Sequence, residues 1–105
     1  MRMTRLLLLA LLVVPPGMAR ADEATERGRW MATQVCSACH TISAQAPAGR
    51  NPRSPPFPAI AERPGVTAAG IATYVRQPHA NMPDHGLTAR QAQDLAAFIM
   101  GQKPR

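Results

Sequence analysis

A five-residue run, Cys36-Ser37-Ala38-Cys39-His40, constrains this chain more than any other part of its sequence. One turn of helix separates the two cysteines, so both sulfur atoms can face one edge of a flat group, and a histidine follows at once. This is the spacing for covalent attachment of haem, in which two thiols bond the vinyl groups and the histidine ligates the iron. The run therefore predicts one covalent haem c per chain, held by Cys36 and Cys39, with His40 as an axial ligand.

Three other kinds of site place two cysteines at this spacing. A thioredoxin-like redox pair sits in an alternating strand and helix pattern, which this sequence lacks. A structural zinc site needs four ligands, and a Cys₂His₂ set made with His79 and His85 would leave His40 without a role. A structural disulfide between Cys36 and Cys39 stays open, because disulfides are common in exported proteins.

Residues 1–21 have the features of a cleaved secretory signal peptide. Arg2 and Arg5 form a positive start, residues 6–14 are an unbroken apolar run, and a small-x-small site closes the segment. Nine apolar residues are too few to span a bilayer, which takes about 20, so we expect no stable membrane anchor. These features predict a periplasmic protein whose single mature domain is 22–105.

The charge of the mature chain bears on its partners. Without the leader there are nine Lys and Arg against six Asp and Glu, a net charge of +3 in place of the formal +6. No basic stripe is interleaved with aromatic residues, so we expect no nucleic-acid partner. A small positive charge suits steering toward an acidic docking face on a redox protein. The 84 remaining residues include only four aromatic side chains, a marginal core that a buried haem would complete.

The predicted fold class is all-α, with about three main helices and a long proline-rich loop wrapped around one haem. Apolar residues at three- and four-residue spacing predict helices from about 23 to 35, from Thr67 to about 77, and from Thr88 to about 100, with each threonine as an N-cap. Six prolines in 41–65 exclude helix interiors and central strands, which predicts an irregular loop there.

Gly28 lies on the apolar face of the first predicted helix, where glycine costs stability relative to alanine. Its place there predicts close approach of another element, and we expect it to face the bulky edge formed by Leu95 and Phe98 of the last helix. Trp30 falls outside the apolar stripe, and the pattern gives it no assigned role.

Two loops offer further groups for the expected haem. The stiff run 54–58 holds proline carbonyls, one of which could accept the His40 Nδ1–H and fix the orientation of the imidazole. Met82 follows in a later loop, where its thioether is a suitable soft sixth ligand for iron. His79 and His85 flank this methionine, so ligation by two histidines stays an alternative.

The mature chain resembles the small bacterial class I c-type cytochromes over nearly its whole length. The likeness is carried by Gly28 placed eight residues before Cys36, the attachment run, Ser54-Pro55-Pro56-Phe57, Asn81-Met82-Pro83, and the stretch from Leu87-Thr88 to Asp94-Leu95-Ala96-Ala97-Phe98-Ile99. The sequence departs from the family at Ser54, where glycine is usual, and at Ala32, where an aromatic residue is frequent.

The resemblance implies a set of roles for particular residues. It places thioether bonds at Cys36 and Cys39, proximal ligation at His40, distal ligation at Met82, and a carbonyl contact to the histidine from Pro55. It also implies an electron-transfer protein, not an enzyme, that carries one electron between a redox donor and acceptor. A haem sensor or peroxidase-like enzyme with a labile sixth ligand, and a cytochrome subunit of a larger oxidoreductase, stay as alternative functions.

Overall fold

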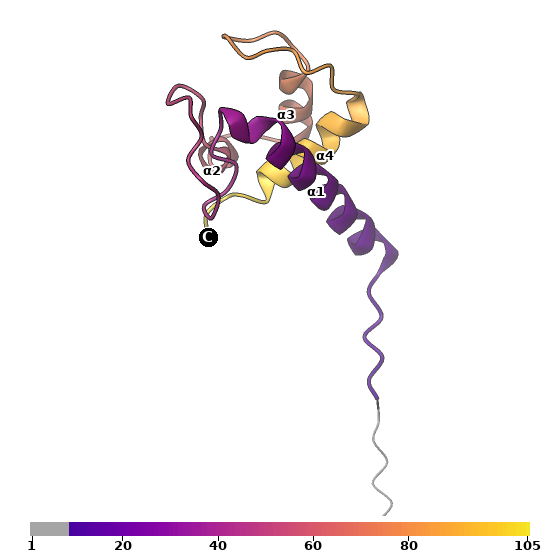
Figure 1. The fold of residues 1–105 in the computed structure, drawn as a ribbon. Helices are drawn as coiled ribbons and strands as arrows, with labels where there is room; N and C mark the ends of the chain where they lie inside the picture. Colours follow the sequence, from indigo (N-terminus) through magenta and orange to yellow (C-terminus); the bar gives the residue numbers. More distant parts are fainter. Residues whose placement is uncertain (1–8) are drawn as a thin grey trace, which may run out of the picture.

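Helices account for all the regular structure in residues 9–105, the part of the chain that the computed structural model describes (Figure 1). In chain order the elements are α1 (Pro16–Gln34), a short 3₁₀ turn η1 (Cys36–Ala38), α2 (Phe57–Ala61), α3 (Ala68–Val75) and α4 (Ala89–Met100). An isolated β-bridge joins His79 and Met82 within one loop. The expected all-α class with three main helices is confirmed, because α2 is only five residues long.

The crossing of α1 over α4 is the central contact of the fold (Figure 1). A β-carbon placed on Gly28 would lie 2.1 Å from the carbonyl oxygen of Asp94 and 2.9 Å from the β-carbon of Phe98. Glycine is therefore required by the close approach of the two backbones. The predicted crossing is present, and its neighbours are Asp94 and Phe98.

An ion pair links α1 and α4 at the same crossing. The Arg27 guanidinium donates from Nε to Oδ2 of Asp94 at 2.7 Å and from Nη2 to Oδ1 at 3.1 Å. The Asp94 carboxylate is buried, and its hydrogen bonds raise the pKa of Arg27 above the ordinary value. A two-pronged pair of this kind fixes the relative position of two elements more strictly than a single contact.

Local capping explains where α3 and α4 begin. The Thr67 hydroxyl accepts the Gly70 N–H at 3.0 Å, and Thr88 forms a reciprocal capping box with Gln91. Both N-caps agree with the sequence prediction, since threonine at this position satisfies one of the free N–H groups of the first turn. The α3 and α4 helices pack on each other, and their apolar faces join α1 in one core. The buried residues of that core are Met31, Ala32, Cys36, Ile42, Phe57, Ile71, Ala72, Ala92, Leu95, Ala96, Phe98 and Ile99.

Two boundaries differ from the sequence prediction. The first helix begins at Pro16 instead of about residue 23, because proline at the first helical position leaves no N–H unpaired and has a suitable φ. The segment 41–65 is not wholly irregular, because α2 forms within it with Pro58 in its first turn. Proline is excluded from helix interiors but is tolerated in that first turn.

The N-terminal segment projects away from the packed helices (Figure 1). Residues 9–23 are exposed, and α1 enters the core only from Gly28 onward. The first eight residues of the predicted leader lie outside the described residues. Within residues 9–105, no helix combines the length and the apolar character needed to cross a membrane.

Candidate haem site

The attachment run directly continues α1. Val35 N–H donates to the Met31 carbonyl at 2.9 Å, and both Cys39 N–H and His40 N–H donate to the Cys36 carbonyl at 3.1 and 2.9 Å. The backbone of the run is therefore a single tight turn at the end of a long helix. Such a turn carries both cysteines and the histidine as one rigid unit.

The two cysteines of the run have different surroundings. Cys36 is 8% exposed and belongs to the hydrophobic core, whereas Cys39 is exposed. Both are free thiols, so the structure does not contain the disulfide that the sequence left open. Burial raises the pKa of the Cys36 thiol to about 11. A thiol-disulfide enzyme needs a nucleophilic cysteine with a lowered pKa, so this environment argues against that alternative.

The His40 imidazole is held by a main-chain acceptor. Its Nδ1 lies 2.7 Å from the Pro55 carbonyl oxygen, which can only accept, so Nδ1 carries the proton and donates. This leaves the lone pair on Nε2 available to a metal ion. The Phe57 ring packs beside the imidazole, with ring centroids 5.3 Å apart at 45°, and is itself 3% exposed.

The loop between the attachment run and α2 lies against the backbone of the run. A β-carbon at Gly49 would lie 2.2 Å from the Cys39 carbonyl oxygen and 2.5 Å from the His40 carbonyl carbon. Asn51 N–H donates to the same Cys39 carbonyl at 3.3 Å, and Gly49 N–H donates to the Thr41 hydroxyl at 2.9 Å. These contacts order the loop around the site. Sequence reasoning missed Gly49, because nothing in its local pattern marks a close backbone contact.

Met82 sits in a second loop, between α3 and α4. Its N–H donates to the His79 carbonyl at 3.2 Å, and its side chain is half-buried. The turn passes through Ala80, which has a φ of 44°, and later Gly86 N–H donates to the Asp84 carboxylate at 2.8 Å. In the view of Figure 1, this loop projects from the end of α3 to the same side as the C-terminal end of α1.

The histidines near Met82 have contacts of their own. The His79 ring stacks on Tyr74 with centroids 4.1 Å apart at 29°, and its Nδ1 lies 2.8 Å from the Gln77 carbonyl oxygen. His85 is exposed. In residues 9–105, no three His, Cys, Asp or Glu side chains gather as a possible metal site. The described residues therefore lack the donor set that the zinc alternative requires.

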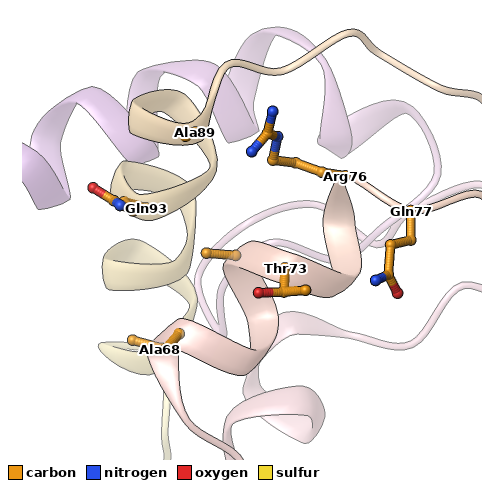
Figure 2. A pocket seen from close by; sticks show the side chains of 8 residues that line it. Ala68, Thr73, Arg76, Gln77, Ala89 and Gln93 are labelled. Carbon is orange, nitrogen blue, oxygen red and sulfur yellow. The ribbon is translucent and has the colours of Figure 1, made fainter.

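Two open grooves lie on the surface of the described part of the chain. One, of about 610 Å³, runs between α3 and α4 and is lined by Ala68, Ala69, Ala72, Thr73, Arg76, Gln77, Ala89 and Gln93 (Figure 2). The other, of about 570 Å³, lies between α1, the segment 42–47 and the end of α4. Neither groove is lined by the cysteines, His40 or Met82. The assignment of the candidate site therefore depends on its donor groups and not on a cavity. Two free thiols one turn apart and an oriented imidazole fit covalent haem.

Comparisons with known proteins agree with this donor set. The family model described as "Cytochrome C oxidase, cbb3-type, subunit III" matches residues 23–99, a range that contains every candidate site residue. A protein of Bradyrhizobium diazoefficiens named cytochrome c-552 is 31% identical over 77 residues, which cover 73% of this chain and 73% of that protein. No solved structure matches the chain significantly.

Proposed function

Because this chain belongs to the small class I c-type cytochromes, which carry covalent haem c, we propose that it is an exported one-electron carrier with its haem bound at Cys36 and Cys39. The iron would take His40 as its proximal ligand and Met82 as its distal ligand. Electron transfer by a c-type cytochrome is the activity of the family. The residue roles, the compartment and the partners are the parts that we propose.

The observation that carries the residue roles is the contact between His40 and Pro55. The carbonyl oxygen, 2.7 Å from Nδ1, holds the imidazole in one tautomer and one orientation. The buried Phe57 ring packs beside the imidazole and limits its movement. When bound, the haem supplies an iron that exchanges one electron between its ferric and ferrous states.

Met82 would complete the coordination as a neutral, soft thioether. Methionine favours ferrous iron and raises the reduction potential relative to a second histidine. The loop that holds it is ordered by hydrogen bonds at His79 and Asp84, which suits a ligand that stays in place in both oxidation states. A filled sixth position separates an electron carrier from a haem sensor or peroxidase-like enzyme.

Export would precede this function, with cleavage after Ala21. The exposure of residues 9–23 supports the proposal, because removing this segment takes no side chain from the core. The mature protein would then begin at Asp22 with a net charge of +3. That charge would steer it toward an acidic face on its donor or acceptor. Intact mass and N-terminal sequencing of the exported holoprotein test the cleavage site.

A second candidate function is supported by the family description. The matching model is described as a subunit of a cbb3-type cytochrome c oxidase, so a role as the cytochrome subunit of a larger oxidoreductase shares the same chemistry. The two functions differ in partner. A protein purified from mild detergent extracts as part of a stable complex would favour the subunit, and a free monomer would favour the carrier.

Absorption spectra of the exported holoprotein test the ligand set. We expect a c-type spectrum that carbon monoxide does not alter when the protein is reduced, and Met82→Ala should keep its haem while becoming sensitive to carbon monoxide. Replacing Cys36 and Cys39 together by serine should abolish stable haem incorporation. A wild-type spectrum that shifts with carbon monoxide would instead support a sensor or an enzyme, and a haem-loaded double serine variant would overturn the attachment site.

A further inference from the structure

We propose that the C-terminal end of α3 positions Met82 through two contacts with the methionine loop, defined as residues 78–88. Near the start of this loop, the Tyr74 ring stacks on His79. At its end, the Arg76 side chain binds the Leu87 carbonyl. This inference rests on the proposed ligation of the iron by Met82, and it makes Tyr74, His79 and Arg76 positioning residues.

The stack between Tyr74 and His79 connects directly to the ligand. The two rings are 4.1 Å apart and nearly parallel at 29°, and His79 Nδ1 is held 2.8 Å from the Gln77 carbonyl oxygen. The backbone of the same histidine accepts the Met82 N–H at 3.2 Å. A displacement of His79 would therefore displace Met82. Tyr74 is 53% exposed and lies outside the hydrophobic core, so its contribution to the core is small.

The second contact holds the other end of the methionine loop. Arg76 is the C-cap of α3, and its Nε donates to the Leu87 carbonyl oxygen at 3.2 Å. Figure 2 shows its side chain extending from the end of α3 toward the chain that enters α4 at Ala89. Because the two contacts lie near opposite ends of the methionine loop, α3 holds both the segment that leaves α3 and the segment that leads into α4.

The turn between these contacts needs outside support. Ala80 has a φ of 44°, in the left-handed region that favours glycine over residues with a β-carbon. Such a conformation persists where surrounding contacts over-determine it. The stack holds His79, the residue before Ala80, and the bridge from His79 to Met82 spans Ala80. Loss of the stack should therefore raise the fraction of molecules in which the loop has opened.

Imidazole binding to the ferric holoprotein measures that open fraction. An external ligand binds iron only when Met82 has left it, so the apparent affinity rises in proportion to the open population. Tyr74→Ala and His79→Ala should each tighten imidazole binding about 2- to 10-fold, from the usual strength of one aromatic pair. The double variant should tighten binding by less than the product of the two single effects, because both single changes remove the same stack. Arg76→Ala should change the affinity in the same direction.

Matched variants separate positioning from other effects. Tyr74→Phe keeps an aromatic ring, and His79→Phe keeps a ring while removing both nitrogen atoms, so both should bind imidazole within about 2-fold of the wild type. His85→Ala changes the other histidine of the loop, which is exposed, and should leave the affinity unchanged. The absorption band of sulfur-ligated ferric haem should disappear at a lower temperature in Tyr74→Ala than in Tyr74→Phe.

The outcomes distinguish this inference from the proposed function. Wild-type imidazole affinity in Tyr74→Ala and His79→Ala, together with tightened binding in Met82→Ala, would overturn the positioning role and leave the ligand set intact. Unchanged binding in Met82→Ala would instead overturn methionine ligation, and the positioning role with it. Loss of the low-spin ferric spectrum in His79→Phe would assign the sixth position to the histidine and refute both.

Discussion

Replacing Gly28 by alanine is the sharpest test of the helix crossing that carries the attachment run. The added β-carbon would lie 2.1 Å from the Asp94 carbonyl oxygen and 2.7 Å from its carbonyl carbon. Both atoms belong to the backbone of α4, so no side-chain rotation relieves the overlap. Moving that contact from 2.1 Å to an ordinary 3.4 Å requires α1 and α4 to separate by about 1.3 Å at this point.

Two opposing contributions, helix propensity and overpacking, set the change in the free energy of unfolding caused by Gly28→Ala. Alanine favours the helix over glycine by about 1 kcal/mol. Overpacking in a well-packed core costs about 1–3 kcal/mol, and the upper end applies here because the obstacle is backbone. A net loss of about 2 kcal/mol in the free energy of unfolding follows. For a domain of this size, that loss lowers the Tm by about 8–16 °C.

Thermal unfolding of the holoprotein, followed by circular dichroism, measures this loss. Gly70→Ala in α3 is the matched control, because its β-carbon would approach only the Thr67 hydroxyl oxygen, at 3.0 Å. It should change stability by less than about 1 kcal/mol, in either direction. A Gly28→Ala protein as stable as the wild type, or more stable, would refute the reasoning, because only the helix-propensity term would then be present.

Two further substitutions test the packing around the same frame. Arg27→Gln should lower the urea midpoint of unfolding, because the buried Asp94 carboxylate loses both charged hydrogen bonds. An unchanged midpoint would show that the pair contributes nothing net. Phe57→Ala should lower the free energy of unfolding by about 3–5 kcal/mol, because it leaves a cavity beside His40. Trp30→Ala, at a residue that is 67% exposed, should change the free energy of unfolding by no more than about 0.5 kcal/mol. Equal effects of the two substitutions would contradict this assignment of the core.

The parts of the fold that the sequence predicts well are those with a local cause. Thr67 and Thr88 mark their helix starts because capping involves residues only two or three positions apart. The turn of the attachment run is likewise local. Gly28 predicts a helix crossing because glycine on an apolar helix face costs stability, which close packing of a second backbone offsets. The pattern nevertheless favours Leu95 over Asp94 as one of its neighbours, and the structure has Asp94 there.

The features that escaped sequence reasoning depend on distant parts of the chain. Arg27 and Asp94 are 67 positions apart, and each alone resembles an ordinary charged residue of a solvated helix face. Gly49 gave no signal because its requirement comes from the backbone of Cys39 packed against it. The pairing of Tyr74 with His79 spans a helix end, where the change of chain direction breaks any periodic pattern.

The contact between His40 and Pro55 also has an evolutionary consequence. Its acceptor is a peptide oxygen, which every amino acid supplies, so no missense change at position 55 deletes it outright. The thioether of Met82, in contrast, disappears with any substitution of that residue, as does the imidazole of His40. The carbonyl that orients the histidine is therefore more robust to mutation than either proposed ligand. Inherited change at position 55 must act by shifting the path of the loop, whereas a change at His40 or Met82 removes a ligand in a single step.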